Sequence, residues 1–419
     1  MKIAIVGLGY VGLPLACLCA EKGHEVLGID IDRNRLSLIE KGISPIDDPE
    51  LKESVKKAKG KIKTGDFSLA REASAVIVCV PTPVDRNHIP DLKPLKGSCE
   101  SLSKNIKKDA LIVIESTIFP GTVVEIVLPI LKKSNVNFYL AHCPERIDPG
   151  NKKWNVRNLP RVVAGIDKNS TKKAAEFYRS IIEAEITELS SVKAAEATKI
   201  MENTFRDVNI AFINEMAMSF DRAGIDILEV IKGASTKPFA FMPHSPGAGV
   251  GGHCISVDPY YLISKAKEIG FNHNFLILAR KINESMPEYT VGLLETELKK
   301  LNKKLDGAKI GVLGIAYKAN VDDMRESPAL EIIEMLKSKK AEVLVFDPHV
   351  AKESNVNNLN ELLKKSDCII LATDHKEFKS MDLDELKKNG IKIMIDGRNC
   401  LDKEKIKSMG ISYHGIGRA

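Results

Sequence analysis

The stretch "KIAIVGLGYVG" (residues 2–12) joins a short apolar run to three glycines in GxGxxG spacing. An uninterrupted apolar run of this length is typical of a buried strand in a parallel sheet. Gly7, Gly9 and Gly12 permit a tight turn and the close approach of a pyrophosphate to the N-terminus of the next helix. The stretch therefore predicts the first strand, turn and helix of a dinucleotide-binding Rossmann domain.

An acidic residue stands where such a site needs one. Asp30 ends the next apolar run, "EVLGID" (25–30), where its carboxylate suits a ribose 2′-hydroxyl. The same charge would repel a 2′-phosphate, so the sequence predicts NAD rather than NADP. Tyr10 and Val11 lie between the glycines and belong to the expected cofactor site. Arg35 lies either near the adenosine or on an ordinary helix surface.

Apolar runs alternate with helical stretches through residues 1–190, which we expect to form the NAD-binding domain. Such runs indicate buried parallel strands of a doubly wound sheet. They are "KIAIVG" (2–7), "EVLGID" (25–30), "SAVIVCVP" (74–81), "ALIVIEST" (110–117), "FYLAHCPE" (138–145) and "RVVAGI" (161–166).

The alternation of apolar runs and helical stretches ends near residue 190. Few helix breakers occur between Ser191 and Gly224, which predicts one long helix in a central helical domain (191–300) that supplies a dimer surface. Strand-like runs return in 301–419, at 308–317, 341–347, 367–373 and 392–398. The expected fold is α/β, with two Rossmann-like doubly wound domains joined by the central helical domain.

Composition narrows the class of protein. No apolar run is long enough to span a membrane, and no basic leader with a cleavage site is recognised. The net charge of +6 is spread along the chain, so we expect no nucleic-acid partner. The eight cysteines show no CxxC spacing, which favours reduced thiols and a cytoplasmic setting.

Polar residues follow several of the predicted strands. Thr82 in "CVPTP" and Thr117 in "ESTIFPGT" are placed to meet the nicotinamide side of the cofactor, or to cap the following helices. Glu145 in "AHCPER" is a candidate base, with an isolated surface glutamate as the alternative. Lys199 and Asn203 stand at i,i+4 on one helix face, where a solvated lysine is the simpler interpretation.

One cysteine lies in an unusual setting. The stretch "GAGVGGHCISVDPYYL" (247–262) surrounds Cys254 with glycines, which allow the backbone to approach a ligand. A thiol there can be exposed and act as a nucleophile. The alternative, a small buried hydrophobe, suits Cys17, Cys19, Cys79 and Cys368 better.

Eight motifs in order resemble the UDP-glucose/GDP-mannose dehydrogenase family over essentially the whole chain. They are "GLGYVGLP", "VPTP", "ESTIFPGT", "CPER", "KIMENTFRDVNIAFINE", "GVGGHCISVDPYYL", "GIAYKANVDDMRESPA" and "DGRN". The resemblance implies an NAD domain, a central dimerisation domain forming a homodimer, and a C-terminal UDP-sugar domain (301–419). It also implies an NAD-dependent, four-electron oxidation of a sugar C6 alcohol to a carboxylate.

The resemblance also implies roles for matching residues. Cys254 would form a thiohemiacetal and then a thioester, while Lys199 and Asn203 stabilise developing oxyanions. Asp258 and Thr117 would position water or assist proton transfer, and Glu145 would be the base for hydrolysis. The remaining matches are Glu145, Arg146, Lys199, Asn203, Gly251, Gly252, Lys318 and Arg398 for the UDP-sugar and Arg325 for the cofactor.

Sequence details favour a UDP-N-acetylhexosamine as the substrate. Many UDP-glucose members carry an acidic residue where this chain has Pro149, which weighs against glucose. The stretch "TKPFAFMP" (236–243) favours UDP-N-acetylglucosamine, and "ENTFRDVNIAFINE" (202–215) points to UDP-N-acetylmannosamine. We expect the former, with the latter and UDP-glucose as alternatives.

Three rival interpretations differ in class. A two-electron dehydrogenase would leave Cys254 inert and make one NADH per sugar. A zinc-binding protein would use His142, Cys143, His253 and Cys254, but adjacent residues on a strand point to opposite faces, so we expect no metal. A non-catalytic nucleotide-sugar sensor would not need Lys199 and Asp258 alongside the thiol.

Overall fold

The computed structural model describes residues 1–85, 90–147, 151, 153–252 and 255–418. Cys254, His253 and Pro149 lie outside the described residues. The chain divides into two compact units, Met1–Glu202 with Tyr260–Phe271 and Asn203–Pro259 with Asn272–Ala419. We describe each unit by itself; the three domains expected from the sequence stay a prediction.

The first unit is built on an eight-stranded sheet in the order β3-β2-β1-β4-β5-β6-β7-β8. The strands are β1 (Lys2–Val6), β2 (Glu25–Ile29), β3 (Ile62–Gly65), β4 (Ala75–Val78), β5 (Ala110–Ile114), β6 (Phe138–His142), β7 (Arg161–Gly165) and β8 (Ile186–Glu188). The six predicted strands are confirmed; β3 and β8 were not predicted. The strand order reverses between β1 and β4, where ligands of open α/β sheets bind.

One predicted orientation is wrong. β7 pairs antiparallel with β6, with Ala141 opposite Gly165 and His142 opposite Ala164. A parallel return would need a crossover element, and the described part of the connection between β6 and β7 contains no helix. This reversal brings the beginning of β7, at Arg161, to the carboxyl end of β6.

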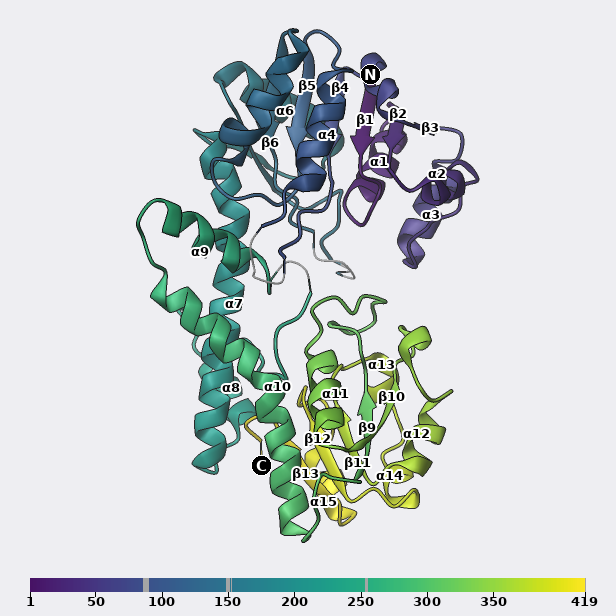
Figure 1. Cartoon of the computed structure of the whole chain (residues 1–419), viewed down its shortest axis with the longest axis vertical. Helices are drawn as coiled ribbons and strands as arrows, with labels where there is room; N and C mark the ends of the chain where they lie inside the picture. Colours follow the sequence, from purple (N-terminus) through teal and green to yellow (C-terminus); the bar gives the residue numbers. More distant parts are fainter. Residues whose placement is uncertain (86–89, 148–150, 152, 253–254, 419) are drawn as a thin grey trace. The chain divides into compact units, whose positions relative to one another are not determined.

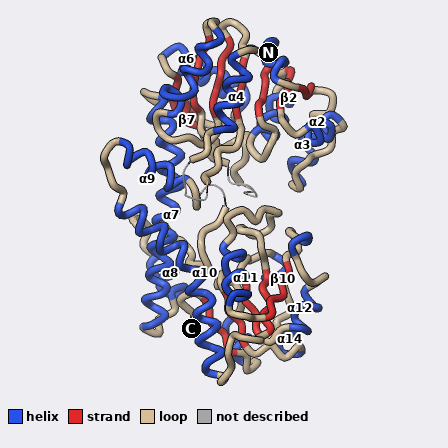
Figure 2. Tube along the Cα trace, in the orientation of Figure 1, coloured by secondary structure: helices blue, strands red, loops and turns tan. Residues whose placement is uncertain are grey.

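Helices cover both faces of this sheet (Figures 1 and 2). Alternate β1 residues point to opposite faces, so Ile3 and Ile5 join one core while Ala4 and Val6 join another. The first core takes residues from α1 (Gly12–Glu21), α3 (Pro49–Lys57) and α6 (Lys168–Ile181). The second takes residues from α4 (Lys93–Ser103), η2 (Val123–Val127) and α5 (Leu128–Leu131). The short helices α2 (Arg33–Glu40), η1 (Phe67–Glu72) and η3 (Lys132–Ser134) complete the unit.

The predicted long helix is α7, which spans Val192–Arg222. It is followed by α8 (Ile227–Ala234), α9 (Asp258–Glu268) and α10 (Asn274–Lys300). Only part of the apolar surface of α7 faces a core, because Ile200 is buried whereas Phe205 and Phe212 are half exposed. No helix among the described residues is both long enough and apolar enough to span a bilayer.

The second unit contains a five-stranded parallel sheet in the order β10-β9-β11-β12-β13. Its strands are β9 (Lys309–Leu313), β10 (Glu342–Phe346), β11 (Cys368–Leu371), β12 (Ile393–Asp396) and β13 (Ser412–Gly415). One face packs on α10 and α11 (Pro328–Ser338) together with residues of α7 and α8. The other face packs on α12 (Leu359–Lys365), α13 (Lys376–Lys379), α14 (Asp384–Lys388) and α15 (Lys403–Ser408). The two-sided covering confirms the predicted second α/β fold; β13 was not predicted.

Candidate active site

The glycine turn between β1 and α1 is built for close backbone contact. A Cβ on Gly12 would lie 1.9 Å from the carbonyl oxygen of Gly7, so the helix can begin there only with glycine. A Cβ on Gly9 would meet no atom within 4 Å, which leaves open space in front of the N-terminus of α1. This open, donor-rich end fits the pyrophosphate of a dinucleotide. Tyr10 and Val11, between these glycines, are partly exposed.

Asp30 lies beside this turn with its carboxylate held in place. The backbone N–H of Leu8 donates to Oδ2 at 2.8 Å and that of Asp32 donates to Oδ1 at 2.9 Å. The Arg35 guanidinium donates to Oδ2 at 3.1 Å. Lone pairs remain on both oxygens for ribose hydroxyls. Arg35 is thus paired with the predicted ribose-binding carboxylate, and its place near the adenosine stays a prediction.

The loops after β4 and β5 are tied together. The Thr82 hydroxyl donates to the Thr117 carbonyl oxygen at 2.6 Å, and the Tyr261 hydroxyl donates to the Thr82 carbonyl oxygen at 2.6 Å. Both predicted threonines therefore lie at the carboxyl edge of the first sheet, and neither contact caps a helix.

A buried carboxylate on α7 binds the backbone of the segment that follows Thr117. Glu196 of α7 accepts hydrogen bonds from the backbone N–H groups of Gly121 at 2.6 Å and Val123 at 2.7 Å. Burial raises the pKa of Glu196 to about 7, against the lowering effect of these two donors. Glu196 was not predicted, because its partners Gly121 and Val123 are distant from it in the sequence.

Glu145 lies at the same edge and is buried. Its Oε1 accepts from the backbone N–H groups of Arg146 at 2.6 Å and Ile147 at 2.7 Å, and its Oε2 accepts from Arg161 Nη2 at 2.8 Å. Arg161 also donates to Glu115 Oε1 at 3.2 Å. The candidate base is thus fixed in place and is not the isolated surface glutamate of the alternative.

Arg146 is already engaged within the protein. Its guanidinium contacts Glu202 of α7 at 2.6 and 3.0 Å and the Pro160 carbonyl oxygen at 3.0 Å. These contacts connect the loop after β6 to α7. Arg146 therefore reaches a substrate only by giving up part of this arrangement.

Lys199, Asn203 and Asp258 come from the helical region. Lys199 is half buried on α7, and its charge adds to burial in lowering the pKa of His142, at the end of β6, to about 3. Asn203 lies one turn further along α7, and its side-chain amide donates to the carboxylate of Asp258, the first residue of α9. Asp258 is buried. This contact joins two of the predicted catalytic residues directly.

The glycine-rich stretch lies against the carboxyl edge of the second sheet. A Cβ on Gly252, whose φ is +85°, would lie 2.6 Å from the ring of Tyr317. The backbone N–H of Gly252 donates to the Arg325 carbonyl oxygen at 3.0 Å, and that of Ala248 donates to the Gly397 carbonyl oxygen at 3.1 Å. These glycines therefore allow close packing against the protein's own backbone and the ring of Tyr317. From the sequence, the glycines were expected only to let the backbone approach a ligand.

Four of the residues predicted to meet the UDP-sugar, Gly251, Gly252, Lys318 and Arg398, lie at this same edge, whereas Glu145, Arg146 and Lys199 belong to the first unit. Gly251 contacts Tyr317, and Lys318 follows Tyr317 directly in the loop after β9. Arg398, after β12, donates to the carbonyl oxygens of Ala372 at 2.9 Å and Tyr317 at 3.3 Å. Arg325 is half exposed and pairs with Asp323 at 2.6 Å.

A polar network that the sequence analysis missed holds the start of the glycine-rich stretch. The Gly247 N–H donates to Asn214 at 3.0 Å, and Asn214 donates to Asn283 of α10 at 3.0 Å. Asn283 and Arg280 both donate to the buried carboxylate of Asp207, at 2.9 and 2.8 Å. Asparagines spaced along helices carry no sequence signal for such a network.

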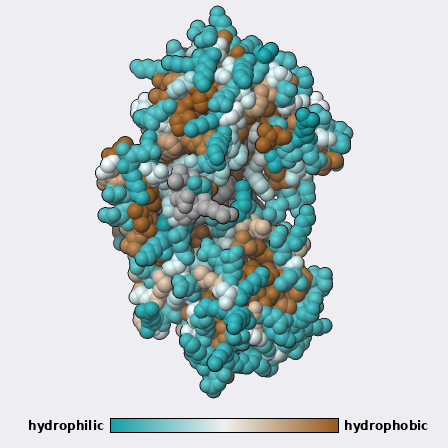
Figure 3. Space-filling view, viewed as in Figure 1, coloured by the Kyte–Doolittle hydropathy of each residue, from teal (hydrophilic) through white to brown (hydrophobic). Residues whose placement is uncertain are grey.

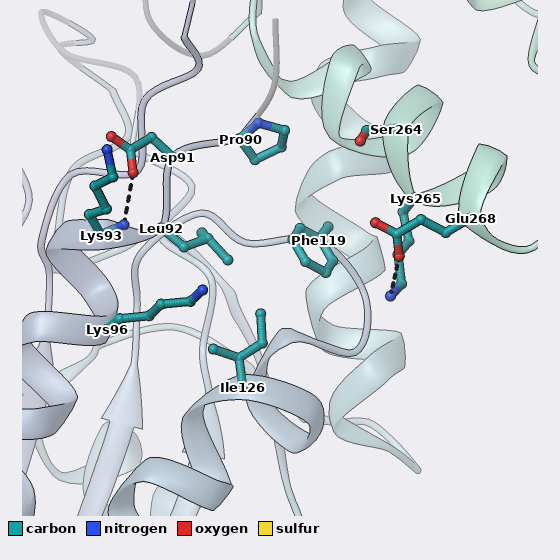
Figure 4. A pocket seen from close by; sticks show the side chains of 10 residues that line it. All are labelled: Pro90, Asp91, Leu92, Lys93, Lys96, Phe119, Ile126, Ser264, Lys265 and Glu268. Carbon is teal, nitrogen blue, oxygen red and sulfur yellow. Dashed lines mark hydrogen bonds and ion pairs between the residues drawn. The ribbon is translucent and has the colours of Figure 1, made fainter.

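A surface hollow of about 370 Å³ lies within the first unit. Phe119 and three lysines, Lys93, Lys96 and Lys265, line part of it (Figure 4). Lys265 is paired with Glu125 and Glu268, both at 3.0 Å. No predicted site residue lines the hollow, so it is separate from the candidate active site.

One described cluster has the ligand types of a metal site. His349, His375 and Glu377 bring three possible ligand atoms within 4.8 Å of one another. However, His375 Nδ1 accepts from the Asn320 N–H at 2.9 Å, and its Nε2 faces Asp347 at 3.0 Å. The lone pair that a metal would need is used, so the cluster does not fit a metal.

Comparison with known sequences identifies one protein family along the chain. Three sequence profiles match: the NAD binding domain of the UDP-glucose/GDP-mannose dehydrogenase family at residues 1–182, its central domain at 193–285 and its UDP binding domain at 311–403.

Relatives cover the whole chain. A UDP-N-acetyl-D-mannosamine dehydrogenase from Pyrococcus horikoshii is 39% identical, over 100% of this chain and 99% of its own length. A UDP-N-acetyl-D-glucosamine 6-dehydrogenase from Pseudomonas aeruginosa is 38% identical, over 97% of this chain and 98% of its own length. The solved structure of a UDP-D-ManNAc dehydrogenase from Pyrococcus horikoshii superposes with a TM-score of 0.93 at 38% identity, covering 100% of this chain and 99% of that one.

Proposed function

Because the chain belongs to the UDP-glucose/GDP-mannose dehydrogenase family, and is an NAD-dependent oxidoreductase, we propose that it oxidises C6 of a UDP-N-acetylhexosamine to a carboxylate. The proposed reaction removes four electrons and uses two NAD and one water per sugar. The contact of Asn203 with Asp258 is the observation that supports the catalytic part of the proposal. Asn203 lies one helical turn after Lys199, and Asp258 lies four residues after Cys254 in the sequence.

The proposed chemistry proceeds at one carbon. The C6 alcohol loses a proton and a hydride to become an aldehyde, and the Cys254 thiolate adds to the aldehyde carbon to form a thiohemiacetal. Loss of a second hydride gives a thioester, and water releases the acid and returns the thiol. NAD, when bound, supplies the hydride acceptor for each of the two oxidations.

The proposed roles follow from the chemistry of each side chain. Asn203 has a second amide hydrogen beyond the one given to Asp258, and that hydrogen is available to an oxyanion. The ammonium of Lys199 adds positive charge on the same face of α7. Asp258, fixed by Asn203, orients water or accepts a proton with Thr117, while Glu145 removes a proton from the hydrolytic water.

The identity of the hexosamine is the finer part of the proposal. The stretch "TKPFAFMP" (236–243) favours UDP-N-acetylglucosamine, whereas the Pyrococcus horikoshii relative is named for UDP-N-acetyl-D-mannosamine. Identities of 39% and 38% to the two named types do not separate them. We keep UDP-N-acetylglucosamine as the first choice and UDP-N-acetylmannosamine as the second.

A turnover panel tests the proposed function. Purified protein is incubated with NAD and, separately, the UDP derivatives of N-acetylglucosamine, N-acetylmannosamine, N-acetylgalactosamine and glucose. We expect an N-acetylhexosamine derivative to give the acid, with two NADH per acid. One NADH per product, or a product that is an aldehyde, would support the two-electron alternative with an inert cysteine.

We also propose a homodimer formed through the central helices. Phe205 and Phe212 of α7 and Phe275 and Leu278 of α10 each expose half or more of their surface. Apolar surface also lies over the beginning of α10 in Figure 3. Large exposed apolar side chains of this kind mark association surfaces, and α7 and α10 are held together by the Asp207–Arg280 ion pair.

A further inference from the structure

A buried arginine is shared by two glutamates at the carboxyl edge of the first sheet. Arg161 places Nη2 2.8 Å from Glu145 and Nη1 3.2 Å from Glu115. All three side chains are at most 4% exposed. One positive charge thus faces two carboxylates, and an uncompensated buried charge costs free energy. The balance of charge depends on whether Glu115 is ionised.

The surroundings of Glu115 define its charge state. Its Oε1 accepts from the Tyr178 hydroxyl at 2.6 Å, and its Oε2 lies 3.6 Å from the Cys79 thiol. Other titratable groups that act on it are the thiols of Cys19 and Cys143 and the charges of Arg161 and Glu145. Burial raises the pKa of all three thiols, so they are uncharged at neutral pH. Among the residues that the structure describes, the charged groups that act on Glu115 are therefore Arg161 and Glu145.

Burial, more than these neighbours, displaces the pKa of Glu115. Burial raises the pKa of Glu115 to about 7, with Arg161 opposing the rise and Glu145 adding to it. Burial also opposes the charge on Arg161, but Glu145 and Glu115 outweigh it and hold the pKa of the guanidinium above its usual range. Between Glu115 and Arg161, the proton that changes near neutral pH is therefore the one on Glu115.

We propose that Glu115 is a positioning residue whose charge, acting through the shared Arg161, sets how readily Glu145 accepts a proton from the hydrolytic water. The inference rests on the proposed function, in which Glu145 is the base for thioester hydrolysis. In that step a water O–H bond breaks, its proton goes to the Glu145 carboxylate, and its oxygen bonds to the thioester carbon. The C–S bond then breaks and the thiolate of Cys254 leaves.

The two charge states of Glu115 have opposite effects on this step. When Glu115 is protonated, the full charge of Arg161 faces Glu145 and opposes proton uptake there. When Glu115 is ionised, it shares Arg161 and repels the charge on Glu145, so Glu145 takes a proton more easily. Acid release should therefore become faster as pH rises through the titration of Glu115.

The test is the pH dependence of acid release in a single turnover, measured from pH 5.5 to 9. The wild type should show one inflection near the pKa of Glu115. Glu115→Gln, which keeps the size and hydrogen bonds of the side chain, should remove the inflection. Above pH 8, acid release by Glu115→Gln should be about 3- to 10-fold slower than by the wild type, because a coupling of one pKa unit changes an equilibrium constant about tenfold. Below pH 6 the two proteins should release acid at the same rate.

Tyr178→Phe is the matched second variant. It removes the hydroxyl that stabilises the Glu115 carboxylate, without changing any charge, so the inflection should move to higher pH with its upper plateau retained. A role that is only structural predicts instead an equal loss of rate at every pH in both variants. That outcome, or an inflection that survives in Glu115→Gln, would overturn the inference.

An infrared titration separates this inference from the proposed function. The infrared difference between the wild type and Glu115→Gln, both without substrate, removes the signal of Glu196, whose pKa is also about 7. That difference should contain the carbonyl stretch of a protonated buried carboxyl group, and this band should disappear as pH rises. Acid formation without this band overturns only the inference. If no UDP-sugar gives acid, the proposed function fails, and the proposed effect of Glu115 on hydrolysis is overturned with it.

Discussion

Asn203 of α7 donates a hydrogen bond from its side-chain amide to the carboxylate of Asp258 at the beginning of α9. Asn203, which the family resemblance predicts to stabilise an oxyanion, is thereby oriented by the buried carboxylate of Asp258. In the proposed mechanism, its other amide hydrogen donates to the developing negative charge.

Asn203→Ala should therefore lower kcat by about 10²–10³, the usual cost of removing one oxyanion donor, with a smaller effect on KM. The matched control is Asn209→Ala, because Asn209 lies on the same helix and its amide donates only to the Phe205 carbonyl oxygen. Initial rates with saturating NAD measure both. Equal small effects of the two substitutions would remove Asn203 from the catalytic group.

Asp30 should control the choice of cofactor. In Asp30→Asn the amide keeps an acceptor oxygen but loses the charge, and Arg35 loses its ionic partner. The ratio of kcat/KM for NAD to that for NADP should fall about 10- to 100-fold, as expected for one hydrogen bond to a charged group. Any increase in kcat/KM for NADP in Asp30→Asn should be lost in the double variant Asp30→Asn with Arg35→Ala, because the guanidinium is then absent. An unchanged ratio would place the ribose away from Asp30.

The proposed dimer surface can be tested without substrate. Phe212→Glu puts a charge on the exposed face of α7 and should yield a species of 46.1 kDa by light scattering, whereas the wild type should have twice that mass. Ile43→Glu changes an equally exposed apolar residue outside the helices and should remain dimeric. A wild type of 46.1 kDa would contradict the proposal.

Stability should depend on pH through His414. Burial opposes its charge, but hydrogen bonds to Asp221 and Glu297 outweigh burial and raise the pKa of His414 to about 9. Because the folded pKa exceeds the usual value of 6.5, this stabilisation is full below pH 6.5 and is lost as pH rises through about 9. The wild-type melting temperature should fall over this range.

His414→Gln should flatten that decline. It leaves Asp221 and Glu297 without their shared cation, so at pH 6 it should cost about 3 kcal/mol of unfolding free energy. Thermal melts at pH 6, 8 and 10 measure both effects. A parallel decline in the two proteins would assign the pH dependence to other groups.

The fold followed from local patterns wherever those patterns were complete. Six apolar runs predicted six strands of the first sheet, because a strand buried on both faces is apolar throughout. β3 was missed because it is the edge strand, and only Ile62 at its start is buried. The direction of β7 was wrong because an apolar run has no polarity of its own, and only the connection decides it.

The site was predictable where a motif carries its own chemistry. The glycine turn and Asp30 are local features, whereas Arg161 meets Glu145 only because β7 runs antiparallel to β6. Had β7 been parallel, Arg161 would lie at the opposite edge of the sheet. Glu115, Glu196 and Asp207 were missed for the same reason, since their partners are distant in sequence.

The most direct test of the central claim, a four-electron oxidation through a thioester on Cys254, uses Glu145→Gln. The amide keeps the side chain's size but accepts no proton, so steady turnover should fall about 10²–10⁴-fold, the usual loss of a general base. Rapid mixing with NAD and the UDP-N-acetylhexosamine should then give a burst near two NADH per active site. Mass spectrometry of the quenched protein should find the sugar acyl group on the peptide that contains Cys254, and Cys254→Ala should abolish this adduct. A burst of one NADH with no adduct would contradict the account.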